Sequence, residues 1–325
     1  MPSPTPSDVH VDKMLTNISV AYAQSRENYV ADKVFPMVPV AKQSDRYFLY
    51  SKGDLLRDDA KERAPGTESA GSGVSIDNTP SYYCPVVSYH EDVSDQLRAN
   101  ADIPLNPFRD SAENTMEKLL IKKERTWAAA FFAASIWDSD WTGKASSPST
   151  NEFLQWDVAN SDPLTDAAAA KEVVRALTGY EPNTMVVGPE VYSILKNHSA
   201  VTDRIKYTQK GIVTADLLAG LFEVEKFLVA KAIYNSAIEG AADSVANIYG
   251  KHCLLAYAAP NPSIRRPSGG YTFQWNGLVG SGEMGIRTKR FRMEHLESDR
   301  VEGEMAFAQK LVCADMGIFL ADAIG

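Results

Sequence analysis

Hydrophobic residues recur at helical spacing between Asn106 and Trp137. Asn106 is a favoured N-cap, Pro107 suits the first helical position, and no other proline or glycine interrupts the stretch. The pattern predicts one helix, roughly 45 Å long at about 1.5 Å per residue. The charged run Ile121–Arg125 is expected on its solvent face. The expected buried stripe consists of Met116, Leu119, Leu120, Trp127, Phe131 and Ala134.

A polar stretch interrupts the hydrophobic pattern between Pro65 and Asn78, where Val74 and Ile76 are the only large apolar residues. Glycine, serine, threonine and acidic residues dominate it, so it cannot bury apolar surface of its own. Aromatic-rich segments that begin near residues 45 and 81 predict a strand on each side. The sequence therefore predicts a long hairpin with a flexible tip.

The first 40 residues show short apolar pieces without a sustained period. Residues 1–8 are rich in proline, serine and threonine, which predicts disorder or ordering only on a partner. Pro36 and Pro39 exclude a helix over Lys33–Val40 and favour an extended path. We interpret this region as an arm that lies along a surface.

Helix and strand patterns alternate from residue 162 to residue 259, which predicts an α/β insertion. The first expected element is a helix capped by Thr165 and ended by Gly179. A strand at Met185–Val187, a turn at Gly188–Pro189 and a helix to about His198 follow it. The last expected elements are a short helix over Thr214–Phe222 and strands within 225–235 and 247–259.

Polar and apolar residues alternate from Tyr271 to the C-terminus, which predicts strands. The glycines of Gly280–Gly285 match GxGxxG, but a strand pattern follows them, so a turn is favoured over nucleotide binding. The next strand places Arg287 and Lys289 on one face, and Arg290 and Arg292 on the other. Contact with phosphate groups is one interpretation of these four basic residues. Pairing with a neighbouring subunit or with nearby acids is favoured, the acids being Glu294, Glu297 and Asp299.

Composition narrows the possible functions. The chain has 325 residues, 44% of them hydrophobic, and 33 basic against 42 acidic residues give a net charge of -9. This charge offers no overall attraction to nucleic acid or to an anionic membrane. No signal peptide or membrane-spanning run is present in the sequence, so we expect a soluble protein without membrane contact.

Residue patterns typical of catalytic or metal-binding sites are sparse in this sequence. Cys84, Cys253 and Cys313 lie far apart, without the spacing of a zinc site or a disulfide framework, and favour a reducing compartment. A polar surface turn is favoured over a metal site for His90–Asp92. Phosphate-loop and hydrolase-elbow motifs are missing from the sequence. We therefore expect a non-enzymatic protein with no cofactor and no metal.

The order of arm, glycine-rich hairpin, long helix, α/β insertion and returning strands resembles the major capsid proteins of tailed bacteriophages. The resemblance implies an α+β fold of the Hong Kong 97 type, with an N-terminal arm, an extended β-hairpin loop, a long spine helix with a peripheral β-sheet, and an α/β axial domain. It divides the chain into an arm (1–44), an extended loop (45–84), a peripheral domain (85–180) with its spine helix at about 107–137, an axial domain (181–262) and returning peripheral strands (263–325).

The resemblance also implies a function. Such proteins assemble into pentamers and hexamers that form an icosahedral shell around double-stranded DNA, so the expected location is the virion, after assembly in the host cytoplasm. The expected partners are copies of the chain, a separate scaffolding protein, a portal, a decoration protein and weakly bound DNA. Expected contact residues are Phe35, Met37 and Val38 in the arm, Lys52, Arg57, Lys61, Arg63, Val74 and Ile76 in the loop, and Tyr207 and Lys210 at the axial pore.

Two alternatives stay open on the sequence. One is an encapsulin-like shell subunit, which would use the same fold around cargo proteins. The other is a soluble α/β enzyme of unknown chemistry, which would be a monomer or dimer with an ordered loop.

Overall fold

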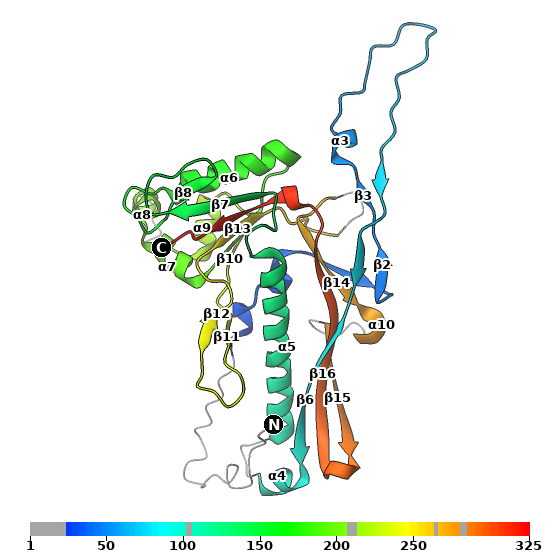
Figure 1. The fold of residues 1–325 in the computed structure, drawn as a ribbon, viewed down its shortest axis with the longest axis vertical. Helices are drawn as coiled ribbons and strands as arrows, with labels where there is room; N and C mark the ends of the chain where they lie inside the picture. The colour runs from blue at the N-terminus through cyan, green and yellow to red at the C-terminus, as the bar shows by residue number, and fades with distance from the viewer. Residues whose placement is uncertain (1–23, 102–105, 207–212, 263–265, 280–284) are drawn as a thin grey trace.

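Two sheets and one long helix form the body of the molecule (Figure 1). The structure is a computed structural model and describes residues 24–101, 106–206, 213–262, 266–279 and 285–325. No helix in these ranges is long and apolar enough to cross a membrane. Short helices at its edges are η1 (Arg26–Asn28), α2 (Ala31–Val34), α4 (Asp95–Asn100), α10 (Asn276–Val279), η3 (Glu294–Leu296) and η4 (Ala314–Met316).

The peripheral sheet is built around one long strand, β16 (Ser298–Leu311). Its first half pairs antiparallel with β6 and β15, and its second half pairs with β14. Helix α5 lies against β6 and β16, and Gly303 permits the approach, since a Cβ there would lie 2.6 Å from Cγ2 of Thr115. The other strands are β1 (Met37–Val40), β6 (Val86–Ser94), β14 (Gly270–Trp275) and β15 (Ile286–Met293).

The second sheet has the order β10-β9-β13-β17-β7-β8 and encloses a core with the surrounding helices. Its strands are β7 (Ser139–Lys144), β8 (Glu152–Leu154), β9 (Thr184–Val187), β10 (Lys226–Val229), β13 (Cys253–Ala256) and β17 (Gly317–Ala321). The helices are α6 (Pro163–Thr178), α7 (Pro189–Asn197), α8 (Ser199–Ile205) and α9 (Ala215–Leu221).

Sheet membership differs from the predicted division of the chain. Strands β7 and β8 lie before residue 181, and β17 lies after residue 262. All three nevertheless join the second sheet, together with β9, β10 and β13 of the predicted axial domain. Hydrogen bonding between distant segments decides this, and local patterns carry no information about it. Another correction concerns α6, whose N-cap is Asp162 rather than Thr165, because the Asp162 carboxylate accepts from the backbone of Leu164 and Thr165.

The long helix α5 runs from Pro107 to Phe131 and is capped by Asn106 as predicted. It ends six residues before the predicted Trp137. The indole of Trp137 folds back and donates to the carbonyl of Phe131 at 2.8 Å, which satisfies a backbone acceptor at the helix end. Ala134 therefore lies beyond the helix and is exposed.

One turn of α5 that was expected in solvent is buried. Lys123 and Glu124, in the predicted wet run Ile121–Arg125, are 3% and 1% exposed. Lys123 forms an ion pair with Asp32 at 2.6 Å, and Glu124 accepts hydrogen bonds from the N-terminal segment. Burial of charged side chains is tolerated where partners satisfy them, and here the partners come from a segment about 90 residues away.

Candidate assembly surfaces

The extended loop is a two-part hairpin that projects from the body (Figure 1). At its root β2 (Ser44–Arg46) pairs antiparallel with β5 (Ser81–Tyr83), and farther out β3 (Leu49–Tyr50) pairs with β4 (Ile76–Asp77). A single helical turn, α3 (Lys52–Leu55), follows β3. All residues from 60 to 79 are exposed, and Asp59, just before them, is partly buried. The predicted hairpin is confirmed.

Large apolar side chains on this loop face solvent in the isolated chain. The predicted contact residues Val74 and Ile76 are 44% and 53% exposed. The sequence analysis missed Phe48, Leu55 and Leu56, which are 60% to 65% exposed. The adjacent leucines in a charged segment were the available signal. Clustered exposed apolar residues of this kind mark an interaction surface.

The basic loop residues differ in their surroundings. Lys52 forms an ion pair with Asp315 of the body, and Arg57 pairs with Asp54 at 3.1 Å within the loop. The guanidinium of Arg63 donates to the carbonyl of Thr67, and Lys61 is exposed. Lys52 therefore fastens the loop root to its own subunit, whereas Lys61 is open to contact from another copy.

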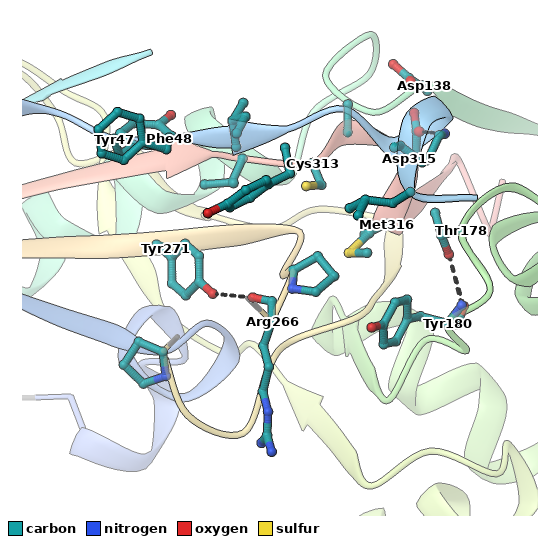
Figure 2. Close-up of a pocket in the computed structure, with 18 of the residues that line it drawn as sticks. Tyr47, Phe48, Asp138, Thr178, Tyr180, Arg266, Tyr271, Cys313, Asp315 and Met316 are labelled. Atoms are coloured by element: carbon teal, nitrogen blue, oxygen red, sulfur yellow. Dashed lines mark hydrogen bonds and ion pairs between the residues drawn. The ribbon is translucent and has the colours of Figure 1, made fainter. Parts of the chain in front are cut away.

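A hollow of about 1200 Å³ lies between the loop root and the body (Figure 2). We call it the loop hollow. Its lining is predominantly apolar and comes from β3, α3, β14 and the segment around η4. Tyr47 and Phe48 lie at one end, and Tyr180 and Met316 at the other. The hollow is large enough for a short stretch of polypeptide.

The arm residues correct the sequence interpretation. Phe35 is 2% exposed and packs against Trp127, Phe131 and Trp137 of its own subunit. Strand β1, which carries Met37 and Val38, pairs in parallel with β14 in the peripheral sheet. The segment 29–40 is thus part of the subunit, and Phe35 is not available to a neighbour. The chain is extended over Met37–Val40, as predicted, but Lys33 and Val34 lie in the short helix α2, where a helix was excluded.

We expect Phe35→Ala to destabilise the isolated subunit by about 3–5 kcal/mol, since a buried ring would leave a cavity. Phe48→Ala is the matched control: Phe48 is 60% exposed, so its loss should change the free energy of unfolding by less than about 1 kcal/mol. Denaturant unfolding of the two variants measures both. If Phe35→Ala left the stability unchanged, the interpretation of Phe35 as part of an arm that contacts a neighbouring subunit would be favoured again.

Glu124 joins three parts of the chain. Its carboxylate accepts from the backbone N–H groups of Val30 at 2.7 Å and Ala31 at 3.0 Å, and from the hydroxyl of Tyr249 at 2.5 Å. Burial raises the pKa of Glu124, while these hydrogen bonds act in the opposite direction and nearby Asp32 adds to the rise. The junction fixes the N-terminal segment to the spine helix.

This junction predicts a pH dependence of stability. Because the pKa of Glu124 is above its usual 4.5, the folded chain binds this proton more tightly than the unfolded chain. The stability from this group is therefore fully present below about pH 4.5 and is lost as pH rises through the folded pKa. Glu124→Gln removes the titration, so the stability of the wild type relative to the variant should fall as pH rises above 4.5, the usual pKa of the group. Urea unfolding across this range tests it, and a constant difference would contradict it.

The basic residues of β15 are paired within the subunit. Arg287 and Lys289 both contact Glu304; burial favours a higher pKa for Glu304, but its two basic partners lower it. Arg290 pairs with Asp299 at 3.0 Å, as anticipated, and Arg292 makes two hydrogen bonds to Asp95, at 2.6 and 2.7 Å.

These ion pairs argue against phosphate contact by the basic residues of β15. They support the favoured interpretation, in which these residues pair with nearby acids. Of the three acids anticipated, Asp299 and Glu294 are used, the latter at 3.7 Å from Arg292. The main partners Glu304 and Asp95 were not anticipated, because strand register and a helix end bring them close. The pore candidates Tyr207 and Lys210, and Gly280–Met284 of the glycine motif, lie outside the described residues.

Potential catalytic groups occupy structural roles. His90–Asp92 is not a turn but part of β6, where Asp92 pairs with Arg300. Ser161 Oγ lies 3.0 Å from Nε2 of His198. However, Nδ1 of His198 accepts the N–H of Ala200, so the neutral ring carries its proton on Nε2 and cannot take one from Ser161. The described ranges contain no group of three or more His, Cys, Asp or Glu side chains suited to a metal ion.

Two curated relatives align with most of the chain. The major capsid protein of Burkholderia phage BcepMu is 29% identical over 282 residues, 82% of this chain and 84% of the relative. The major capsid protein of Pseudomonas phage JBD67 is 24% identical over 342 residues, 97% of each chain. No protein-family model matches the chain.

Solved structures share the fold. A phage-related protein of Bordetella bronchiseptica RB50 superposes with a TM-score of 0.66 at 23% identity, covering 92% of this chain and 94% of its own. The capsid protein of Cyanophage P-SCSP1u has a TM-score of 0.59 at 11% identity, covering 98% and 95%. An encapsulin of Synechococcus elongatus PCC 7942 reaches 0.53 at 12% identity, covering 96% and 95%.

These likenesses show the fold: the chain has the α+β architecture of the Hong Kong 97 type. Both sequence relatives are major capsid proteins of bacteriophages, which confirms the resemblance inferred from the sequence.

Proposed function

We propose that this chain assembles into pentamers and hexamers that form the icosahedral shell around the double-stranded DNA of a tailed phage. The observation that carries the proposal is the alignment with phage major capsid proteins over most of the chain. The exposed apolar loop supports it, because an isolated subunit gains from covering that surface on another copy. The net charge of -9 offers no overall attraction to DNA, which is consistent with only weak, non-specific contact with the packaged DNA.

The proposed role is structural, without enzymatic chemistry, and is carried out in the virion after assembly in the host cytoplasm. We also propose a separate scaffolding protein, a portal and a decoration protein as partners, on the family resemblance alone. Expression of the full chain by itself tests the scaffold: uniform shells formed efficiently without a partner would overturn that part.

An encapsulin-like shell is the second candidate, since one encapsulin shares the fold. That likeness extends to the fold only, whereas the phage relatives align by sequence. Electron microscopy of particles from cells that produce the chain in its native genomic setting separates the two. Tailed, DNA-filled particles support the phage capsid. Particles that hold protein cargo would support the encapsulin, and a monomer or dimer with no particles would contradict both.

A further inference from the structure

The loop hollow is an apolar concavity with no occupant from its own subunit. Phe48, Leu55 and Leu56 form the wall on the loop side, and Tyr180, Tyr271 and Met316 line the body side. Lys52 and Asp315 join across the root and hold the two walls together. Phe48, Leu55 and Leu56 are 60% to 65% exposed, and apolar side chains this exposed are stabilised when another surface covers them.

A second apolar feature has the opposite shape. Strands β11 (Ile233–Asn235) and β12 (Val245–Asn247) pair antiparallel and form a hairpin that projects from the axial domain. We call it the axial hairpin. Ile238, near its turn, is 80% exposed, and Val245 is 64% exposed. An isoleucine held this far into solvent has no partner in its own subunit.

The two features lie on different sides of the spine helix. In Figure 1 the axial hairpin is to the left of α5, and the loop root, with α3, is to the right. One subunit therefore cannot insert its own hairpin into its own hollow. The hairpin also lies lower in this view than the loop root, so a neighbouring copy must be rotated for its hairpin to reach the hollow, as subunits are in the heterologous, head-to-tail contact of a closed ring.

The charges of the two features are complementary. Residues 236–247 carry Glu239 and Asp243 and no lysine or arginine. The charged residues that line the hollow are Arg46, Lys52, Asp138, Arg266 and Asp315. Lys52 and Asp315 pair with each other, and Arg46 and Arg266, both exposed, form no ion pair with a carboxylate in the described part of the chain, so with Asp138 the lining keeps a net positive charge. An acidic turn with an apolar tip would thus meet an apolar hollow with two unpaired guanidinium groups.

We propose that the axial hairpin of one copy enters the loop hollow of the next copy, with Ile238 against Leu55 and Leu56, and that this contact repeats head to tail around each ring of subunits. The partner is a second copy of this chain. The proposal rests on the proposed shell function and adds the surfaces by which neighbours in a ring recognise each other. Repetition around a closed ring leaves neither surface exposed.

Disulfide trapping tests the contact. All chains carry Cys313→Ser, because Cys313 lines the hollow, whereas Cys84 and Cys253 are fully buried. One preparation adds Ile238→Cys and a second adds Leu56→Cys. Mixed before assembly and then mildly oxidised, they should yield at least tenfold more covalent dimer than either preparation alone. The matched control pairs Ile238→Cys with Leu296→Cys, which is 49% exposed on η3, and should give no such increase.

The outcomes separate this proposal from the proposed function. Particles that form normally without the mixed disulfide would overturn the hairpin contact and leave the shell function standing. An equal yield from Ile238→Cys alone would overturn the head-to-tail arrangement. If the unmodified chain forms no particles under any condition that yields folded protein, the shell function and this contact both fail.

A charge substitution gives an independent measurement. Ile238→Asp and Leu56→Asp should each lower the yield of assembled particles at least tenfold, while circular dichroism and thermal unfolding of the subunit stay as in the unmodified chain. Particle yields equal to that of the unmodified chain for both variants would contradict the proposal.

Discussion

Leu120→Asp is expected to prevent the subunit from folding. Leu120 is 4% exposed and belongs to the buried cluster on α5 that also contains Ile286, Met305 and Phe307. The substitution removes about 2–5 kcal/mol of apolar burial and places a carboxylate in an apolar cluster, where the nearby buried Lys123 is already paired with Asp32. The two costs together are comparable with the ~5–15 kcal/mol that stabilises a typical domain.

The control for this experiment is Lys118→Asp, an exposed position on the same helix. It introduces the same residue and should change the free energy of unfolding by less than about 1 kcal/mol. Circular dichroism and soluble yield distinguish the two variants. A folded Leu120→Asp subunit would show that α5 does not pack as described.

Deletion of Gly66–Gly73 is expected to abolish shell assembly and leave the subunit folded. Every residue of this stretch is exposed, so its removal takes little from the core. The β3–β4 pairing, Leu49 with Asp77 and Tyr50 with Ile76, lies closer to the root and is retained. The shortened loop can no longer reach a neighbouring copy. Particle yield by sedimentation and subunit folding by circular dichroism are measured on the same preparation.

The matched control replaces the same eight residues with glycine and serine. The native stretch is already glycine, serine, alanine and threonine, apart from Glu68, so the control keeps the length and most of the chemistry. It should assemble. Loss of assembly in the control would show that particular side chains matter, and loss of folding in the deletion would place the hairpin within the core.

Elements with local signals were predicted well. Thr214 caps α9 through its side chain, and Gly188–Pro189 separates β9 from α7, as the sequence predicted. Such signals act within a few residues, because a cap or a turn is satisfied by its own neighbours. The stretch 66–73 was also predicted correctly, since its composition provides nothing to bury.

Elements that depend on distant partners were predicted less well. The end of α5 carries no glycine or proline, and the Trp137 indole that satisfies it is placed there by packing against Phe35. Glu124 looked like a solvent residue in its charged run, and Phe35 looked like part of an arm. Both are buried because residues 24–40 fold back onto the spine helix and the peripheral sheet.

The sequence by itself determined the order of elements, the long helix, the hairpin with an unpackable tip, and the resemblance to phage capsid proteins. These depend on periodicity, caps and composition, which are local properties. The tertiary structure alone decided which strands share a sheet, that Phe35 and Glu124 are internal, and that Phe48, Leu55 and Leu56 face a hollow. Burial and pairing are set by contacts between residues far apart in the chain. RAPGTESAGSG lies outside every such contact, which leaves it free to reach another copy.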